Sequence, residues 1–329
     1  MTNRKKVFSA MRPTGALHLG HYFGALQNWV KMQDDMDCVF GVADWHALTT
    51  NYADPEDIKE NTRQLIIDWL SIGLDSNKAV FMIQSQNLAH AELYLLLGMV
   101  TPIAWLERTP SYKEMRAQLT DKNLDNYGFL GYPVLMTADI IIYDSDYVPV
   151  GIDQVPHVEL SREIVRHFHA LYKTEVFVEP QPILTDVPKL PGLDGRKMSK
   201  SYGNSIALGE SADSIEQKLK RMVTDTNRIR KTDTGNPDVC PVFDWHKVFS
   251  TQDERAEVCA GCRGAQIGCI DCKKILIKHV ESLVAPIRER RKRFEVEVKD
   301  AREYIKTSQL RANEMAEQVV ERVRQAIKI

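Results

Sequence analysis

The sequence predicts an α/β protein in which a doubly wound, Rossmann-type parallel sheet is followed by an all-helical C-terminal domain. From the N-terminus to about residue 185, apolar strand-like runs alternate with amphipathic stretches of helical spacing. This alternation is typical of a parallel sheet covered by helices on both faces. Several prolines between residues 180 and 191 then mark a break, and from about Leu208 the periodicity is helical almost to the end. We therefore expect an α/β domain over 1–206 and a helical domain over 207–329.

Length and composition fit this division. The chain has 329 residues, more than one compact domain usually contains, with 43% hydrophobic and 27% charged residues. The net charge of −2 gives no global nucleic-acid signature, so a polyanion would have to meet a local basic surface. No apolar stretch is long enough to span a membrane, and the basic start at Arg4 precedes no signal-peptide core. We expect a cytoplasmic protein.

The expected elements follow from the spacing of apolar residues. The strands are expected at 7–11, 38–43, 79–84 and 147–150, and Pro149 should place the last of these at an edge or at a strand end. The helices are expected at 18–32, 56–74, 89–99, 134–143 and 154–172. The segment Pro180–Pro182 is expected to be a break between domains. In a sheet of this kind, ligands collect at the carboxyl ends of the strands.

The turn at residues 12–21, Arg-Pro-Thr-Gly-Ala-Leu-His-Leu-Gly-His, lies between the first strand and the first helix. Unpaired N–H groups and the positive dipole end at a helix N-terminus favour phosphate. His18 and His21 lie three residues apart on one face, and Gly15 and Gly20 allow a close backbone approach. The turn therefore indicates a phosphate site, although a simple strand-to-helix turn with two surface histidines is the alternative.

A second polar segment, residues 193–204, contains Lys197-Met198-Ser199-Lys200-Ser201 between glycines. Lysines supply point charges where charge develops on a leaving pyrophosphate, so the segment suits a mobile clamp on phosphates. A solvated basic loop is the alternative interpretation.

Together, these two motifs match in order and spacing the two signatures of class I aminoacyl-tRNA synthetases, with His18-Leu19-Gly20-His21 as the first and the lysine segment as the second. The stretches 43–49, 132–140 and 148–154 extend the match, and the whole chain resembles the tryptophanyl-tRNA synthetases. The resemblance implies activation of L-tryptophan with Mg²⁺-ATP and transfer to the 3′ end of tRNA(Trp). It also implies a homodimer, with 207–329 as the anticodon-binding domain and no DNA or membrane partner.

The resemblance further implies roles for individual residues. The catalytic residues would be His18, His21, Lys113, Lys197 and Lys200. The ATP-binding residues would be Arg12, Pro13, Thr14, Gly20, His21, Gly151, Ile152, Asp153, Val187, Lys197, Met198, Ser199, Lys200 and Ser201. Asp153 would accept hydrogen bonds from the ribose hydroxyls; Ile152 stands where the family often has Glu. The tryptophan-binding residues would be Phe8, His46, Tyr132, Met136, Asp139 and Gln154.

Asp139 carries the prediction of specificity. It lies in an otherwise apolar helical run, where a carboxylate costs free energy unless it is paired. Because an indole has one donor and no acceptor, a buried acceptor selects it well. A surface aspartate is the alternative. Met136 would pack on the ring from one turn earlier, and Phe8 would form the floor of the pocket.

The cysteines of the helical half suggest a metal site. Cys259, Cys262, Cys269 and Cys272 form two C-x₂-C pairs, which could be a structural zinc knuckle. Cys240, Cys262, Cys269 and Cys272 instead resemble the ligands of a [4Fe–4S] cluster found in a subset of bacterial tryptophanyl enzymes. We favour the cluster, with zinc as the alternative.

Basic runs at 218–221, 227–231, 273–278 and 288–293 are candidates for tRNA contact, and Lys273 and Lys274 are the preferred pair. A solvated helix face is the alternative, above all for the last run. Two other functions stay open: a tyrosyl-tRNA synthetase of the same class, and a non-catalytic, synthetase-like RNA-binding protein.

Overall fold

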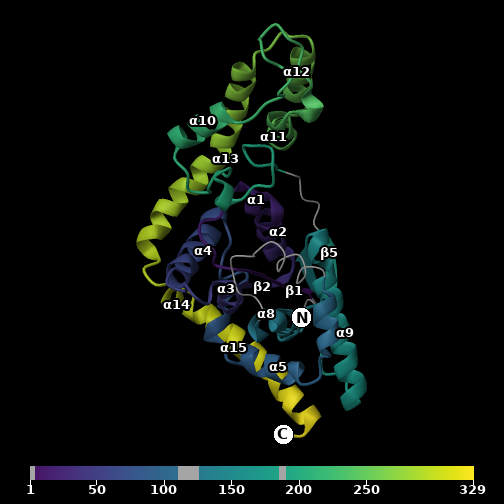
Figure 1. Ribbon diagram of the computed structural model, residues 1–329. Helices are drawn as coiled ribbons and strands as arrows, with labels where there is room; N and C mark the ends of the chain where they lie inside the picture. Colours follow the sequence, from purple (N-terminus) through teal and green to yellow (C-terminus); the bar gives the residue numbers. More distant parts are fainter. Residues whose placement is uncertain (1–3, 110–125, 185–189) are drawn as a thin grey trace.

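The computed structural model describes residues 4–109, 126–184 and 190–329 (Figure 1). Lys113 and Val187 therefore lie outside the described residues. A five-stranded sheet occupies the centre, with β1 (Lys6–Met11), β2 (Asp37–Val42), β3 (Val80–Ile83), β4 (Tyr147–Val150) and β5 (Gln181–Leu184). The strand order is β3-β2-β1-β4-β5 and every pairing is parallel. The predicted fold class, a doubly wound Rossmann-type sheet with a helical C-terminal part, is confirmed.

Most helices lie where the apolar spacing predicts them. In the first 184 residues they are α1 (Leu19–His21), the π-helical turn η1 (Tyr22–Leu26), α2 (Gln27–Asp35), α3 (Asp44–Asn51), α4 (Ile58–Ile72), α5 (Ala89–Gly98), α6 (Ile103–Arg108), α8 (Tyr127–Ile141) and α9 (Val155–Tyr172), with short 3₁₀ turns η2 (Gln84–Gln86) and η3 (Ile152–Gln154). α8 begins seven residues before its predicted start at 134. There the Asn126 side chain caps the helix by accepting a hydrogen bond from the Phe129 N–H at 2.9 Å.

Two details of the sheet differ from expectation. The segment beginning at Gln181, predicted to be a break, forms β5 and pairs along its length with β4. Pro182 is tolerated because β5 lies at the edge of the sheet. β4 is not an edge strand, since β1 and β5 flank it. Pro149 nevertheless fits near the strand end, because β1 pairs with β4 only at Tyr147.

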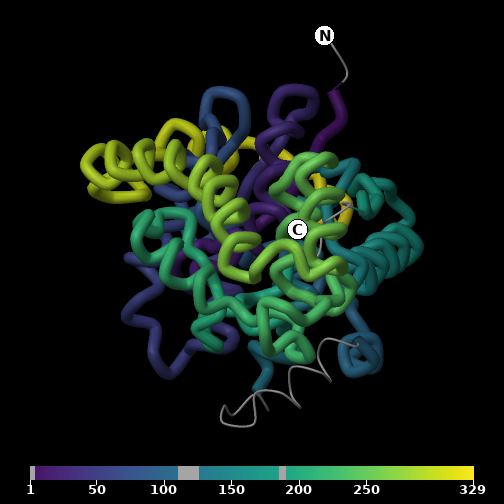
Figure 2. The backbone as a smooth tube through the Cα atoms, turned by 90° about the horizontal axis from the view of Figure 1, so that it is seen from above, coloured from purple at the N-terminus to yellow at the C-terminus, as the bar shows by residue number. Residues whose placement is uncertain are grey.

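The C-terminal half is helical, as expected. It contains η4 (Lys200–Tyr202), α10 (Ala212–Arg221), η5 (Pro237–Val239), α11 (Pro241–Phe249), α12 (Gln252–Arg263), α13 (Cys269–Glu297), α14 (Ala301–Tyr304) and α15 (Lys306–Ile327). α10, α11, α12 and the start of α13 gather at one end of the molecule (Figure 1) and lie in front of the α/β part when seen from above (Figure 2). α15 instead returns beside β3 and α5 (Figure 1). Ser308 Oγ and Gln309 Oε1 of α15 accept hydrogen bonds from the backbone N–H groups of Phe81 and Ile83 on β3. Side chains of α15 thereby cover an edge that would otherwise expose unpaired donors.

The core has two apolar layers, one on each face of the sheet. Alternate strand residues point to opposite faces, so Val7 and Phe40 enter one layer, and Phe8 and Val39 enter the other. The first layer continues without interruption into α10 and α13. The helical part is therefore joined to the sheet through a shared hydrophobic core. Among the described residues, no helix is long and apolar enough to cross a membrane.

Candidate active site

A cavity of about 390 Å³ opens at the carboxyl ends of β1 and β4. All six residues predicted to bind tryptophan line it, together with Arg12 and Gly151 from the predicted ATP set: they are Phe8, His46, Tyr132, Met136, Asp139 and Gln154. These residues come from β1, α3, α8 and the end of η3. The cavity has the size of a small-ligand pocket and lies where parallel sheets bind ligands.

The two signature segments contact each other beside this cavity. The Gly20 N–H points to the sulfur of Met198 at 3.3 Å, and Lys200 Nζ donates to the carbonyl oxygen of Thr14 at 3.0 Å. The Leu19 N–H donates to the carbonyl oxygen of Ile206, and the Leu208 N–H donates to the carbonyl oxygen of Leu17. Gly15 has a φ of +104°, and a Cβ there would lie 3.1 Å from Lys200 Nζ. The ammonium group of the lysine segment thus lies directly on the first turn.

His18 and His21 are close partners at the start of α1, with ring centroids 3.8 Å apart. Burial, with a smaller effect of Lys200, lowers the pKa of His18 to about 4. Burial also lowers the pKa of His21 to about 3, assisted by His18 and Lys200. Both rings are therefore neutral at physiological pH. A neutral imidazole can donate one N–H hydrogen bond to a phosphate oxygen without carrying charge into the site.

The lysine segment is held by two residues that the sequence analysis did not single out. Asn204 Oδ1 accepts a hydrogen bond from the Ser199 N–H, and Asn204 Nδ2 donates to Asp194 Oδ1 at 2.7 Å. Asp194 also pairs with Arg196. Within this scaffold Lys197 and Ser201 are exposed. An Asn shortly after a Gly-flanked basic loop is the kind of signal that could have revealed a loop-fixing role.

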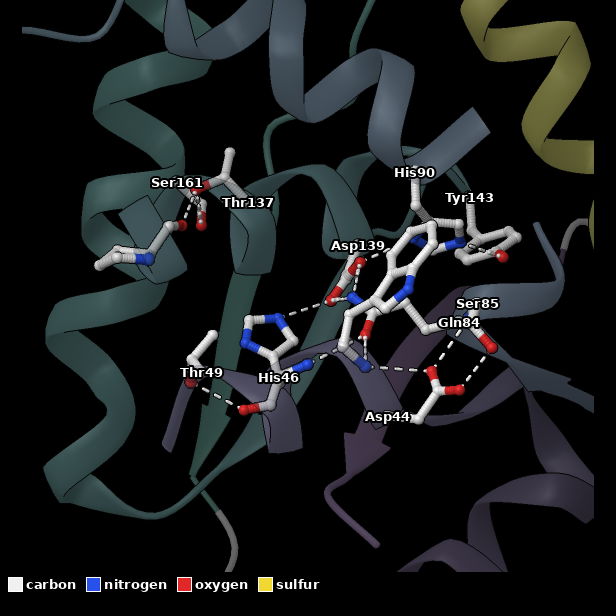
Figure 3. Close-up of polar contacts among 12 residues, drawn as sticks. Asp44, His46, Thr49, Gln84, Ser85, His90, Thr137, Asp139, Tyr143 and Ser161 are labelled. Atoms are coloured by element: carbon white, nitrogen blue, oxygen red, sulfur yellow. Dashed lines mark hydrogen bonds and ion pairs between the residues drawn. The ribbon is translucent and has the colours of Figure 1, made fainter. Parts of the chain in front are cut away.

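Asp139 lies on the wall of this cavity, buried and paired through both carboxylate oxygens (Figure 3). Gln84 Nε2 lies 2.8 Å from both carboxylate oxygens, His46 Nε2 lies 2.9 Å from Oδ2, and His90 Nδ1 lies 2.6 Å from Oδ1. Burial favours the neutral acid, but the hydrogen bonds from His46 and His90 outweigh it and lower the pKa of Asp139 to about 2. The carboxylate is therefore an ionised acceptor. The interpretation of Asp139 as a surface aspartate is wrong.

Gln84 and His90 were not identified from the sequence. Gln84 Oε1 accepts hydrogen bonds from the backbone N–H groups of Trp45 and His46, so this side chain ties the start of α3 to Asp139. His90 Nε2 lies 2.7 Å from the Tyr143 hydroxyl, which continues the network away from the cavity (Figure 3). A polar residue directly after the apolar strand β3 and a lone histidine among apolar residues in α5 were the available signals.

Asp153, predicted to contact ribose, lies at the mouth of the cavity on η3. Its Oδ2 accepts a hydrogen bond from Gln154 Nε2 at 2.9 Å, and a Cβ on Gly151 would lie 2.8 Å from Oδ1. The Asp153 side chain thus lies close against the backbone of Gly151. Ile152, the departure from the family pattern, is largely exposed and leaves the carboxylate in place.

The four cysteines of the iron–sulfur interpretation line one small apolar cavity between α11, α12 and α13. They are Cys240, Cys262, Cys269 and Cys272. Cys259 lies outside this lining, and its sulfur interacts with Arg263.

Burial, with the neighbouring thiols, raises the pKa of Cys272 to about 12. Arg228 and His246 approach two of the sulfurs, at 3.8 Å from Cys262 and 3.3 Å from Cys272. Within the described ranges, no three His, Cys, Asp or Glu side chains stand in a ready metal-binding arrangement.

Several cations proposed for tRNA contact have internal partners. Lys273 is buried, and its Nζ donates to the carbonyl oxygens of Lys220 and Met222, which end α10. The prediction that Lys273 contacts tRNA is therefore wrong, because its ammonium satisfies a helix C-terminus. In the 288–293 run, Arg288 pairs with Glu281 and Arg290 donates to the Ser71 carbonyl. The solvated-face alternative holds for only part of that run: Lys292 and Arg293 are exposed and pair along the helix with Glu289 and Glu297, whereas Arg288, Arg290 and Arg291 contact α4 or the segment after the lysine loop.

A family of proteins described as "tRNA synthetases class I (W and Y)" matches residues 1–285. The chain belongs to this class I tRNA synthetase family. It is 48% identical to the tryptophan–tRNA ligase of Thermotoga maritima, with 98% of this chain and 99% of that protein covered. It is 41% identical to the tryptophan–tRNA ligase of Aquifex aeolicus, with 98% of this chain and 100% of that protein covered. A tryptophanyl-tRNA synthetase from Campylobacter jejuni, solved with ADP and tryptophan, superposes with a TM-score of 0.88 at 30% identity, covering 98% of this chain and all of that one.

The two signature segments of this family are brought together in the fold: Gly20 and Met198 are 178 residues apart in the sequence and contact each other. A tyrosyl-tRNA synthetase from Archaeoglobus fulgidus shares the fold at 20% identity, which by itself does not separate the two amino acids.

Proposed function

We propose that this enzyme activates L-tryptophan with Mg²⁺-ATP and transfers the tryptophanyl group to the 3′ end of tRNA(Trp). One observation carries the choice of amino acid: an ionised, buried carboxylate, Asp139, lies on the wall of the cavity beside the two signature segments. Full-length similarity to tryptophan–tRNA ligases supports the same conclusion. The rival tyrosine specificity would require an acceptor and a donor for a phenol, and Phe8 offers neither.

The chemistry needs no side-chain nucleophile, because the tryptophan carboxylate attacks the α-phosphorus. The enzyme's part is to position the reactants and to stabilise charge on the departing pyrophosphate. Neutral His18 and His21 would donate to phosphate oxygens at the start of α1, beside the N–H of Gly20. Lys197 and Lys200 would move onto the phosphates. Lys200 would exchange its contact with the Thr14 carbonyl for one with a phosphate oxygen.

Tryptophan selection would depend on rearrangement within the Asp139 network. Both carboxylate oxygens are already occupied by Gln84, His46 and His90. His46 is the partner nearest the cavity, so we propose that it turns away to meet the amino acid while the indole N–H takes its place. Gln84 and His90 would stay and keep the carboxylate ionised. Met136 and Phe8 would contact the ring.

The test of this function is ATP–pyrophosphate exchange by the purified protein with tryptophan and, separately, with tyrosine. We expect exchange with tryptophan and at most a trace with tyrosine, because a site built around a buried acceptor rejects a ring that lacks the matching N–H. Exchange with tyrosine alone would establish the tyrosyl alternative. Exchange with neither amino acid would support the non-catalytic alternative.

We propose in addition that Cys240, Cys262, Cys269 and Cys272 hold a [4Fe–4S] cluster. Four thiol groups on one water-poor cavity fit the ligand set of such a cluster, and N–H groups of Arg228 and His246 are placed to donate to its sulfur ligands. Zinc is the alternative occupant. Either group would join α11, α12 and α13 and take no part in amino acid activation.

Anaerobically purified protein is expected to contain about four iron and four sulfide ions per chain and to absorb visible light. Cys262→Ser should lose iron, because its sulfur lines the cavity, whereas Cys259→Ser should retain it as the matched control. One zinc and no iron in the wild-type protein would refute the cluster. Equal loss of iron in both variants would refute the ligand set.

For tRNA binding, we propose the exposed end of the helical part formed by α10, α12 and the start of α13, with 207–329 as the corresponding region of the chain. Lys274 is exposed there, unlike Lys273. α15 would belong functionally to the α/β domain of residues 1–206, because it covers β3. The reaction would take place in the cytoplasm.

A homodimer is proposed from an apolar surface on α5 and α6. Leu88, Leu95 and Met99 share one face at spacings of seven and four residues, and Ile103 follows them. All four side chains are more than half exposed, which is unusual for contiguous apolar residues on a monomer. A solution mass of twice the 37.6 kDa of one chain is the expected measurement.

A further inference from the structure

Asp68 of α4 is a buried carboxylate that the proposed chemistry does not use. Its side chain is 1% exposed and lies where α4, the turn before His18 and helix α13 meet. Its two oxygens have different partners. Oδ2 accepts a hydrogen bond from the backbone N–H of Leu17 at 3.1 Å, and Oδ1 accepts one from Arg291 Nε at 2.8 Å. One side chain thus bridges the first signature turn and the helical part.

The electrostatics of this bridge involve three charges. Burial raises the pKa of Asp68, while Arg291, the Leu17 N–H and Lys200 act in the opposite direction. Burial would lower the pKa of Arg291, but Asp68 and Glu295 raise it overall. The charge of Asp68 is also felt at Lys200, whose pKa is lowered by partial burial. Removing Arg291 would leave a buried carboxylate without its strong partner.

The surroundings are shaped for this contact. A Cβ on Gly209 would lie 2.7 Å from Cδ of Arg291, so the glycine makes room for the arginine side chain. Gly209 follows Leu208, whose N–H donates to the Leu17 carbonyl. Leu17 is therefore held on both sides, through its N–H by Asp68 and through its carbonyl by the strand-like segment after the lysine loop. His18 and Gly20 follow directly in the chain.

Arg291 stands on the same helix as two of the cavity cysteines, with Pro286 between them. α13 runs from Cys269 to Glu297, so Cys272 and Arg291 are separated by nineteen residues, or about 28 Å along the axis. Through Arg291, α13 contacts Asp68, and through Asp68 it contacts the N–H that precedes His18.

We propose that Asp68 and Arg291 form a positioning link that fixes the ATP-binding turn relative to α13, so that ATP affinity depends on a contact made by the helical part. The proposal rests on the adenylate-forming function proposed above. Neither residue would touch ATP. Asp68 would set the position of Leu17 and hence of His18 and Gly20, and Arg291 would hold Asp68 in place and balance its charge.

The test uses four full-length variants in ATP–pyrophosphate exchange: Asp68→Asn, Arg291→Gln, the double variant, and Arg290→Gln as a matched control. Arg290 also joins α13 to α4, through the Ser71 carbonyl, but does not contact Asp68. We expect Asp68→Asn and Arg291→Gln to raise the KM for ATP about tenfold or more, because small misplacements of a binding turn are costly. In both variants the KM for tryptophan should change less than about twofold, and in Arg290→Gln the KM for ATP should also change less than about twofold.

Two further results separate a positioning role from general destabilisation. The double variant should have a KM for ATP no higher than that of either single variant, because each single substitution already breaks the same link. Hydrogen exchange at a peptide spanning residues 15–20 should accelerate in Asp68→Asn and Arg291→Gln but not in Arg290→Gln, and this readout does not need activity. If Asp68→Asn fails to fold, Arg291→Lys, which keeps the charge, should retain an ATP KM closer to wild type than Arg291→Gln does.

Two results would overturn the link. One is an equal increase of the KM for ATP and the KM for tryptophan in Asp68→Asn and Arg291→Gln. The other is an unchanged KM for ATP together with unchanged hydrogen exchange at residues 15–20. Absence of exchange activity in the wild-type protein would instead refute the proposed function. In that case hydrogen exchange at the peptide spanning residues 15–20 would still show whether the link exists.

Discussion

Lys200→Ala is expected to lower the kcat of ATP–pyrophosphate exchange by about 10²–10³-fold, because a cation aimed at developing phosphate charge contributes mainly in the transition state. Lys200 Nζ rests on the Thr14 carbonyl, next to the start of α1, and its side chain is exposed to solvent. Desolvation lowers its pKa, and its ammonium is a compact point charge that phosphate oxygens can bind. The KM for tryptophan should change little, since the amino acid cavity does not include this side chain.

The matched control is Lys59→Ala on α4. Its ammonium is mostly exposed and has only a long contact with Asp300, at 3.9 Å. Removing that charge should leave exchange within about twofold of wild type. A Lys200→Ala enzyme with undiminished kcat would show that the lysine segment is not the clamp on the departing pyrophosphate.

Asp139→Asn is expected to reduce kcat/KM for tryptophan about 100-fold, or about 2.7 kcal/mol of transition-state stabilisation. The amide keeps the shape of the carboxylate but loses its charge, and its N–H₂ group meets donors from Gln84 or His90. The KM for ATP should stay within about twofold. Thr137→Ala is the control, because Thr137 lies on the same helix and bonds Ser161 on α9. It should lower stability without raising the KM for tryptophan.

The same variant should alter the dependence of stability on pH. The pKa of Asp139 lies at about 2 in the folded protein, below its usual 3.8, so the paired carboxylate stabilises the wild type above about pH 4. That contribution is lost as the pH falls from about 4 to about 2. Asp139→Asn should unfold with a shallower acid transition over this interval, as followed by circular dichroism. Identical acid profiles, or an unchanged kcat/KM for tryptophan, would contradict the proposed role of Asp139.

The residues that the sequence identified share one property: a local pattern reveals them. Phe8, Tyr132, Met136 and Asp139 could be named because the stretches that contain them resemble those of tryptophanyl-tRNA synthetases, and the structure gathers them in one cavity. His90 and Gln84 could not be assigned to Asp139 in this way. Their hydrogen bonds join residues 49 and 55 positions apart, and nothing in the local sequence specifies such a partner.

Charge gives the clearest contrast. Lys273 and Lys274 are adjacent and identical in type, yet Lys273 is buried against the end of α10 and Lys274 is exposed. Likewise, the basic run at 288–293 could have met RNA, solvent or protein. Only packing against α4 showed that Arg291 has the buried partner Asp68. A sequence records the charge of a side chain, whereas its desolvation and its partner depend on the whole surrounding fold.

By itself, the sequence determined the Rossmann-type sheet, the two signature segments, the residues of the amino acid cavity and the four cysteines that share a second cavity. The sheet follows from the periodicity of apolar residues, and the other features follow from motifs that resemble those of the family; both are properties of short stretches of chain. The tertiary structure alone decided that α15 returns to cover β3, that Gln84 and His90 hold Asp139, and that Asp68 connects Arg291 to the turn before His18. Each of these is a contact between distant segments, and its free energy exists only once the chain has packed them together.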